Sequence, residues 1–263
     1  MTKSLKTIAI IPARYASTRF PGKPLALIAG TPMIQHVYER VRDAKRVSEV
    51  YVATDDKRIA DVVEAFGGKF IMTSPSLRSG TDRCAAAASK IKADIIANIQ
   101  GDEPVISPAT IDAAISELVK SPEIGMSTAA VRITDPDVLA SENTVKVVVT
   151  KNGNALYFTR AVMPFLRGVP RREYLSRFPF LKHLGIYIYR KEFLQKLTKL
   201  SETPLESAEK LEQLRVLENG YTIRVAVVQE DTMSVDVPLD VPAVEELIIG
   251  LNSKDKRNRI GKA

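Results

Sequence analysis

The sequence predicts an α/β protein with a mostly parallel central sheet flanked by helices and a smaller mixed or antiparallel subregion. In the first half, short apolar runs alternate with segments whose apolar residues recur at helical spacing, and proline or glycine separates them. Repeated strand–helix units connect through right-handed crossovers and build a parallel sheet covered on both sides. The length of 263 residues, with 45% apolar and 26% charged residues, is typical of a globular protein with a full core.

The first half contains the clearest elements. Apolar runs predict buried strands at 8–11, 50–53, 70–72 and 95–99. Helical spacing predicts helices at 31–42, 56–66, 82–91 and 107–120, and Thr31 before Pro32 fits an N-cap followed by a proline at the first helical position. Ligands bind beyond the carboxyl ends of strands in such sheets. We therefore expect a site in the loops 12–23, 73–83 and 100–104.

The second half has a different pattern. Val145 to Val149, an Asn152-Gly153 turn and Ala155 to Phe158 predict a β-hairpin. Further elements are predicted as strands at 183–189 and 222–228 and as helices at 191–200, 204–219 and 244–251. We divide the chain into a core at 1–139, a more antiparallel subregion at 140–215, a return to the core at 216–250 and a basic tail at 251–263.

Charge and composition limit the classes of function. The net charge is +7, but Lys254, Lys256, Arg257, Arg259 and Lys262 against one aspartate place +4 of it in the last ten residues. A basic solvated end explains this better than a nucleic-acid-binding stripe, so no nucleic acid is expected as a partner. The single cysteine, Cys84, allows no intrachain disulfide. The sequence contains neither a leader peptide nor an apolar run of about 18–20 residues, so we expect a cytoplasmic protein without a membrane partner.

The loop from Pro12 to Leu25 is the strongest functional signal. It follows the first buried strand and places three cations, Arg14, Arg19 and Lys23, within ten residues. Forked arginine donors, a lysine charge and backbone N–H groups suit a triphosphate. The loop lacks the P-loop and dinucleotide-binding patterns. The alternative is a solvated basic loop, and the position at the end of a strand favours a site.

From this loop onward the chain resembles the cytidylyltransferases that activate 3-deoxy-D-manno-octulosonate (Kdo), also called CMP-Kdo synthetases. The resemblance extends from Ile8 to about Leu247 and rests on eight segments in order. They are IIPARYASTR with PGKPL from Ile10, VATD from Val52, SGTDR from Ser79, QGDEP from Gln100, ALYF from Ala155 with Arg160, HLGIY from His183, LEQLR from Leu211, and Val235-Asp236. The resemblance implies a nucleotide-diphospho-sugar transferase-like fold and a reaction of CTP with Kdo that yields CMP-Kdo and pyrophosphate, for lipopolysaccharide biosynthesis.

The same resemblance implies a magnesium site. Asp102 follows a predicted strand and Asp236 matches the family's second metal-binding aspartate; Mg²⁺ usually takes one or two protein carboxylates. Asp102 by itself would as readily form a turn, and Asp240 fits a helix cap better than a ligand. Arg14 and Lys23 would then neutralise the leaving pyrophosphate, while Arg19 would contact the triphosphate or the sugar.

Base recognition is expected from Ser79, Thr81, Arg83 and Gln100, together with backbone groups near Ala13. Hydroxyls, amides and main-chain groups can distinguish cytosine from uracil by their hydrogen-bonding pattern. Without the resemblance, Arg83 would be read as a surface arginine on a helix.

The sugar pocket is expected from a second set, which is Arg160, His183, Tyr187, Glu212 and Gln213. A satisfied structural histidine is the alternative for His183. The match is poor between about Pro164 and Phe180, where the basic sequence predicts a mobile lid or loop. That difference leaves open a related acidic sugar, such as 8-amino-Kdo or a sialic acid. A nucleotide-sensing or nucleic-acid-binding protein and a non-catalytic scaffold are the rivals from other classes, and the resemblance also implies a homodimer.

Overall fold

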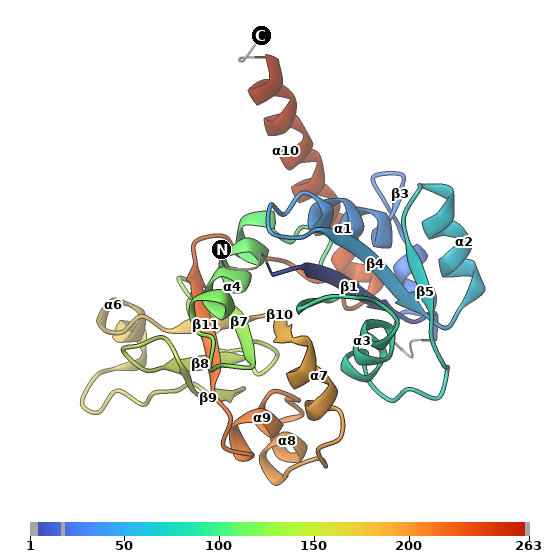
Figure 1. The fold of residues 1–263 in the computed structure, drawn as a ribbon. Coiled ribbons are helices and arrows are strands. Elements are labelled where there is room, and N and C mark those ends of the chain that lie inside the picture. Colours follow the sequence, from blue (N-terminus) through green and yellow to red (C-terminus); the bar gives the residue numbers. More distant parts are fainter. Residues whose placement is uncertain (1–4, 17–18, 261–263) are drawn as a thin grey trace. The chain divides into compact units, whose positions relative to one another are not determined.

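A computed structural model describes the backbone of residues 5–16 and 19–260, and the side chains through Leu251 (Figure 1). The described chain forms two compact units that interleave along the sequence. The parallel unit comprises Ile8–Lys92, Asn98–Pro108 and the described residues from Thr232 onward; the mixed unit comprises the described residues through Thr7, Ala93–Ala97 and Ala109–Asp231. The predicted division consists of four consecutive segments of the chain, whereas these two units are each built from separate segments. The four-part division stays a prediction.

Three parallel strands organise the parallel unit, and they are β1 (Thr7–Ala13), β4 (Glu49–Thr54) and β5 (Phe70–Met72). The apolar residues of β1 and most of those of β4 are buried, as expected for strands covered on both sides, whereas Met72 of β5 is exposed. The helices α1 (Met33–Arg42), α2 (Lys57–Ala65) and α3 (Gly80–Ser89) follow these strands in turn, and Figure 1 shows α1 and α3 on opposite sides of them. The three strands therefore end at one edge, where their following loops begin.

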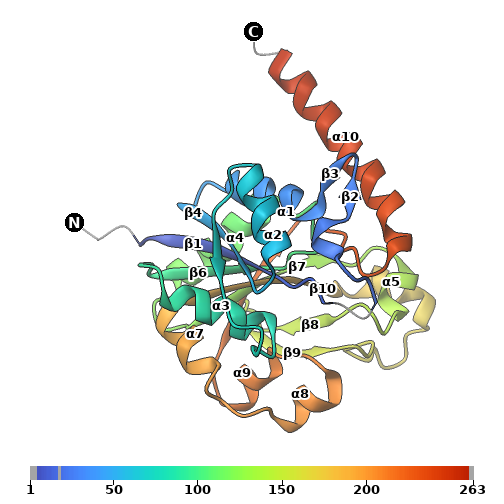
Figure 2. The same cartoon turned by 90° about the vertical axis from the view of Figure 1, so that its right-hand side faces the viewer.

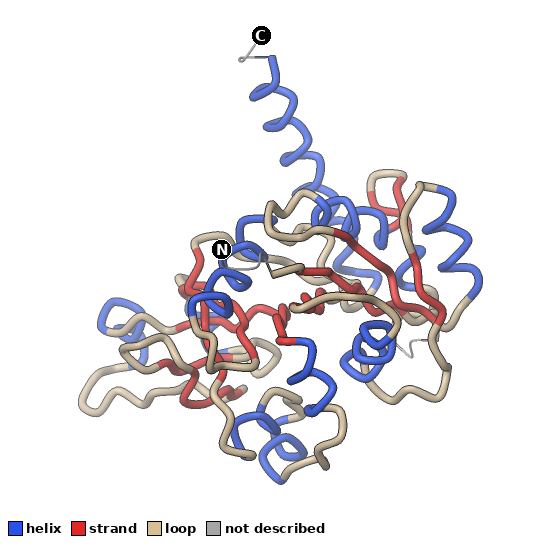
Figure 3. The backbone as a smooth tube through the Cα atoms, in the orientation of Figure 1, coloured by secondary structure: helices blue, strands red, loops and turns tan. Residues whose placement is uncertain are grey.

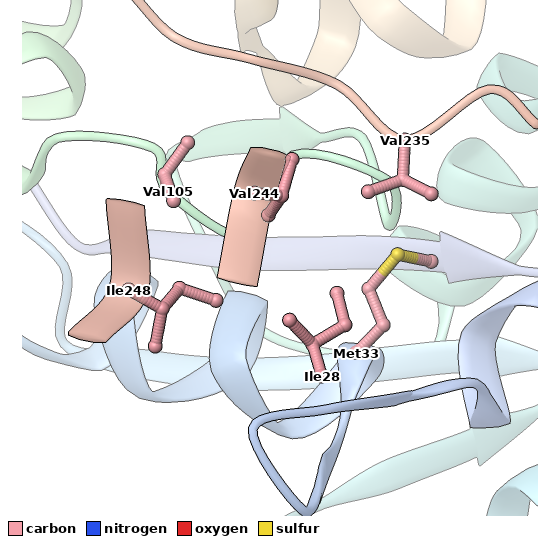
Figure 4. Close-up of a cluster of buried hydrophobic side chains, with 6 residues drawn as sticks. All are labelled: Ile28, Met33, Val105, Val235, Val244 and Ile248. Carbon is pink, nitrogen blue, oxygen red and sulfur yellow. The ribbon is translucent and has the colours of Figure 1, made fainter. Parts of the chain in front are cut away.

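A second layer of this unit joins distant parts of the sequence. Figure 4 shows Ile28, Met33, Val105, Val235, Val244 and Ile248 in one apolar cluster. Ile28 lies in the short strand β2 (Leu27–Ile28), which pairs with β3 (Thr31–Pro32), and Val244 lies in α10 (Val241–Ile260). Burying these side chains fixes the segment around Val235 beside the residues that follow β6 (Ile95–Ile99).

The mixed unit is built on five strands: β7 (Met126–Arg132), β8 (Lys146–Val149), β9 (Ala155–Thr159), β10 (Leu181–Arg190) and β11 (Ile223–Val228). β10 pairs antiparallel with β7 and β8, β8 forms a hairpin with β9, and β11 runs parallel to β7. Its helices are α4 (Pro108–Lys120), α5 (Pro136–Ala140), α6 (Tyr174–Arg177), α7 (Lys191–Leu197), α8 (Pro204–Glu209) and α9 (Leu214–Glu218). Figure 2 shows α8 and α9 together beside β9.

Most predicted elements are confirmed, and two predictions are wrong. The predicted helix 204–219 is two helices, α8 and α9, because Lys210 adopts a left-handed conformation with φ of 53° and ends α8 (Figure 3). The predicted cap at Thr31 is also wrong, since that residue is in β3 and α1 begins after Pro32.

The segment 164–180 is mostly loop, as predicted, and contains the short helix α6. Tyr174 and Phe180 are buried in an apolar cluster with Ile133 and Leu139, and the rings of Tyr174 and Phe180 stack with centroids 5.7 Å apart. The basic residues of this segment predicted a mobile lid or loop. Its aromatic residues pack against Ile133 and Leu139 of the mixed unit.

The chain's last helix exceeds the prediction. α10 continues past Leu251 to Ile260, because the intervening residues contain neither glycine nor proline and include several good helix formers. The side chains of the basic tail lie outside the described residues. Among the described residues, no helix combines the length and the apolar character needed to span a membrane.

Candidate functional site

The predicted site residues fall into two groups, one in each unit. In the parallel unit, the loop after β1 is held to the loop after β5 by Arg14, whose Nη2 donates to the carbonyl of Leu77 at 2.5 Å. Gly22 closes the loop by donating its N–H to the carbonyl of Tyr15 at 2.9 Å. The guanidinium carbon of Arg58 lies 3.3 Å from the centre of the Tyr15 ring on the loop. These contacts fix the shape of a loop whose sequence alone contains few packing residues.

Lys23 connects two acidic segments that are far apart in sequence. Its Nζ donates to Asp102 Oδ2 at 2.6 Å and to the carbonyl of Val235 at 2.9 Å. The N–H of Val235 also donates to the carbonyl of Asp102 at 2.9 Å. The pair is partly shielded, with the Lys23 and Asp102 side chains 15% and 29% exposed. Asp102 thus lies beside the residue that precedes Asp236.

Asp236 is positioned by its own segment. Arg19 Nη2 donates to Asp236 Oδ1 at 3.1 Å, in a pair that is largely exposed. Asp240 Oδ2 accepts the N–H groups of Asp236 and Val237 at 2.7 and 2.9 Å. Asp240 therefore caps the turn that presents Asp236, which agrees with the expectation that it caps rather than binds a ligand.

The residues expected to recognise the base surround the end of β1. Ser79 is the N-cap of α3, and its hydroxyl accepts the N–H of Asp82 at 3.0 Å. A side chain at Gly101 would place its Cβ 3.0 Å from the carbonyl oxygen of Pro12, so only glycine permits this close approach. A Cβ at Gly80 would lie 3.4 Å from Pro12 Cγ and 3.9 Å from Gln100 Oε1. The three loops thus meet beside Ala13, and Thr81 is buried behind them.

Arg83 differs from the surface arginine that its sequence context alone would predict. Its side chain is fully buried, and its Nη1 and Nη2 donate to Thr73 Oγ1 at 2.5 Å and to Asp55 Oδ2 at 2.9 Å. Burial lowers the pKa of its guanidinium, which the Asp55 charge partly offsets. Arg83 therefore supports the loop at 73 directly, and sequence reasoning missed Asp55 as its partner.

In the mixed unit, three predicted sugar residues form a continuous group. His183 and Tyr187 both lie on β10, with ring centroids 5.5 Å apart. Tyr187 Oη donates to Gln213 Oε1 at 3.3 Å. Gln213 is buried, and its Nε2 has no hydrogen-bond partner among the described residues. A buried amide donor of this kind needs a partner, and a ligand oxygen can supply one.

Arg160 is held near this group by main-chain contacts. Its Nε and Nη1 donate to the carbonyls of Glu209 at 2.9 Å and Glu142 at 3.0 Å. The Glu209 carboxylate accepts the backbone N–H of Arg160 at 2.9 Å. Glu209 lies in α8 and Gln213 lies between α8 and α9, so the break at Lys210 places both beside β9. Glu212 is half-buried in the same turn.

Sequence reasoning missed several supporting residues in the mixed unit. Lys146 is fully buried, and its Nζ donates to the carbonyls of Ser141, Thr144 and Arg160 at 2.6–2.8 Å. Thr128 is buried on β7 and contacts His183. Two sequence signals could have identified these residues. Lys146 lies inside an apolar run, and Thr128 belongs to a Ser-Thr pair inside a run of small residues.

The described residues contain no cluster of three or more histidine, cysteine, aspartate or glutamate side chains suited to a metal. Asp102 and Asp236 offer two carboxylates in adjacent segments. That donor set fits Mg²⁺ only when phosphate oxygens and water complete the coordination, which is how Mg²⁺ usually binds with nucleotides.

Comparisons with known proteins identify the family of this chain. The model of the family described as Cytidylyltransferase matches residues 8–224. A 3-deoxy-manno-octulosonate cytidylyltransferase from Geobacter metallireducens is 52% identical over 92% of this chain and 97% of its own length. One from Desulfosudis oleivorans is 47% identical over 94% of this chain and 99% of its own.

A solved structure extends the agreement to the fold. CMP:2-keto-3-deoxy-manno-octonic acid synthetase, solved in complex with CTP, is 43% identical to this chain. It superimposes with a TM-score of 0.87 over 93% of this chain and 99% of its own. The predicted α/β fold class is thereby confirmed, and the chain belongs to the family of 3-deoxy-manno-octulosonate cytidylyltransferases.

Proposed function

We propose that this chain transfers cytidine monophosphate from CTP to Kdo and releases pyrophosphate. One observation carries the proposal from the structure: Lys23 joins Asp102 to the segment of Asp236, and Arg19 pairs with Asp236. The two carboxylates, Asp102 and Asp236, can bind a metal ion. The two cations, Lys23 and Arg19, can bind the phosphates of a triphosphate. The named activity of the relatives supports the same reaction.

In the proposed reaction, the anomeric hydroxyl oxygen of Kdo bonds to the α-phosphorus of CTP and releases its proton to water. The bond from that phosphorus to the oxygen bridging to the β-phosphorus breaks, and the electron pair leaves with pyrophosphate. Catalysis of this kind depends on positioning and on stabilising phosphate charge. Arg14 and Lys23 neutralise the leaving group, and Arg19 contacts the triphosphate.

Asp102 and Asp236 would hold Mg²⁺, which supplies charge stabilisation to the phosphate oxygens. Lys23 Nζ donates to Asp102 Oδ2 at 2.6 Å and to the carbonyl of Val235 at 2.9 Å. An ammonium group has three protons, so one remains for a phosphate oxygen. The base contacts are assigned to Ser79, Thr81, Arg83, Gln100 and the backbone near Ala13. The sugar contacts are assigned to Arg160, His183, Tyr187, Glu212 and Gln213.

The first test is pyrophosphate release by the purified protein with CTP, Mg²⁺ and Kdo. UTP and ATP are the nucleotide controls, and 8-amino-Kdo and sialic acid are the sugar controls. Release with CTP and Kdo alone supports the proposal. Release only with another sugar acid would reject Kdo as the substrate, and no release with any pair would reject the enzyme.

The Asp102→Asn variant tests the metal assignment. It keeps the side-chain shape and removes one charge, so we expect a fall in kcat of about 10²-fold or more. Asp61→Asn is the matched control, because Asp61 is 56% exposed and pairs with Lys57 on the surface of α2. Mg²⁺-dependent CTP binding, measured by calorimetry, should weaken in the Asp102 variant only. Near wild-type turnover would remove Asp102 from the metal site.

We also propose a cytoplasmic homodimer, which supplies CMP-Kdo for lipopolysaccharide biosynthesis. The family resemblance motivates the dimer, and large exposed apolar side chains on β9 and β11 of the mixed unit support it; Leu156 and Val227 are 59% and 54% exposed. Light scattering measures the mass directly. A dimeric wild type that becomes monomeric with Leu156→Asp supports this interface, whereas a monomeric wild type excludes the dimer.

A further inference from the structure

Thr128 lies opposite an irregularity in β10. Leu184 pairs with Ala129 and Tyr187 pairs with Thr128, so Gly185 and Ile186 bulge out of the ladder. The Thr128 side chain is fully buried, and its hydroxyl lies 2.6 Å from the carbonyl oxygen of Ile186. The same hydroxyl lies 2.9 Å from His183 Nε2. Thr128 therefore connects the bulge to the histidine of the sugar group.

The hydroxyl has only one proton to donate, and this decides the state of His183. A carbonyl oxygen can only accept, so the 2.6 Å contact with Ile186 requires the Thr128 proton. The contact with His183 can then be a hydrogen bond only if Nε2 carries a proton and Thr128 accepts it. The neutral ring consequently has an unprotonated Nδ1.

The surroundings of His183 favour a neutral ring. The Phe158 and Tyr187 rings lie with centroids 4.9 and 5.5 Å from its own, and only 9% of the residue is exposed. Burial lowers the pKa of His183 to about 3. Tyr187, whose ring lies beside that of His183, donates to Gln213 Oε1 at 3.3 Å, and Gln213 Nε2 has no hydrogen-bond partner among the described residues.

We propose that Thr128 is a positioning residue that holds His183 as the neutral tautomer protonated on Nε2, so that Nδ1 accepts a hydrogen bond from a hydroxyl group of the sugar acid. The assignment of that hydroxyl rests on the proposed function. The tautomer itself rests on the contacts of Thr128 and holds in the free protein.

A purely structural role for Thr128 is the competing explanation. Its bond to the Ile186 carbonyl stabilises the bulge, and losing it would lower stability whatever the state of His183. The test therefore needs a measurement on the imidazole itself. The chain helps here, because His36 and His183 are its only histidines.

The experiment records long-range ¹H–¹⁵N correlation spectra of the ligand-free full chain, labelled with ¹⁵N in its histidine rings, at neutral pH. His36→Gln assigns the two rings. In the wild type and in Thr128→Ser, which keeps the hydroxyl, His183 should show a protonated Nε2 and an unprotonated Nδ1. In Thr128→Val the buried Nε2–H loses its acceptor, so the population should move toward the Nδ1-protonated form.

Kinetics test the role of Nδ1. Loss of one neutral hydrogen bond predicts that Thr128→Val raises KM for Kdo by about 2- to 10-fold, with KM for CTP unchanged and kcat within about twofold of wild type. Thr128→Ser should match the wild type. An Nδ1-protonated or charged ring in the wild type, an unchanged tautomer in Thr128→Val, or an equal defect in both variants would overturn the proposal. Failure to use Kdo at all would reject the proposed function, while the spectra still decide the tautomer.

Discussion

The buried neutral His183 predicts a specific loss of stability in mild acid. Burial lowers its pKa in the folded chain from 6.5 to about 3. The unfolded chain takes up a proton as the pH falls below about 6.5, whereas the folded chain does not until about pH 3. Stability from this residue is therefore complete above the unfolded pKa and declines as the pH falls toward the folded one.

The magnitude follows from the two pKa values. At about pH 7.5 the unfolded state gains only about 0.1 kcal/mol from this proton, and at about pH 5.5 it gains about 1.4 kcal/mol. The wild type should thus lose about 1.3 kcal/mol between these pH values through His183 alone. In His183→Gln this contribution is absent, although the variant is less stable at both pH values because it disturbs the contact with Thr128.

The assay is urea unfolding of both proteins at the two pH values, with fluorescence and circular dichroism as independent probes. The difference in pH response between wild type and His183→Gln isolates the histidine, because all other titrating groups are common to both. His36→Gln serves as a matched variant that removes the other histidine. Equal pH responses in wild type and His183→Gln would refute a neutral, buried His183.

Two further predictions concern the parallel unit. Gly22 has a φ of 69°, and an added Cβ would lie 3.2 Å from the Tyr15 ring, so Gly22→Ala should lose about 1–2 kcal/mol of stability and bind CTP several-fold more weakly. Gly67 has a similar φ of 77°, and an added Cβ there would meet nothing within 4 Å, so Gly67→Ala is the control. Urea unfolding and calorimetric titration should find weaker CTP binding in the Gly22 variant only. Equal CTP affinity in the two variants would reject a role for this loop shape. Arg83→Gln should cost about 3–5 kcal/mol because it leaves Asp55 unpaired. A double-mutant cycle with Asp55→Asn should give a coupling above about 1 kcal/mol, and simple additivity would contradict the pairing.

The elements of the parallel unit were predictable because local signals and burial agree there. β5 has the predicted bounds, since it is a short apolar run ended by polar or breaking residues. β7 was missed because its serine and alanine residues give no strong strand signal. It forms a strand through its pairing with β10 and β11, which periodicity cannot reveal.

The candidate site divides in the same way. The rule that ligands bind after parallel strands was sufficient to select the loops of Arg14 and Asp102. It could not identify Lys23 as the partner of Asp102, because the two are 79 residues apart and meet only when their loops fold together. Asp236 entered through the family resemblance, and its neighbour Val235 is placed by burial in the cluster beneath α10.

The two groups of residues solve different electrostatic problems. In the parallel unit, cations and carboxylates are paired at partly exposed loops, so a charged ligand can exchange these partners with little change in net charge. In the mixed unit, His183 and Gln213 are buried, and the Gln213 Nε2, which has no partner among the described residues, is costly unless a ligand pairs with it. A neutral buried site of this kind discriminates by hydroxyl pattern, because an analogue lacking a hydroxyl leaves a buried group unpaired. Under the proposed function, affinity for phosphate would arise from paired charges at the surface of the parallel unit. Selectivity for the sugar would arise from buried neutral groups of the mixed unit.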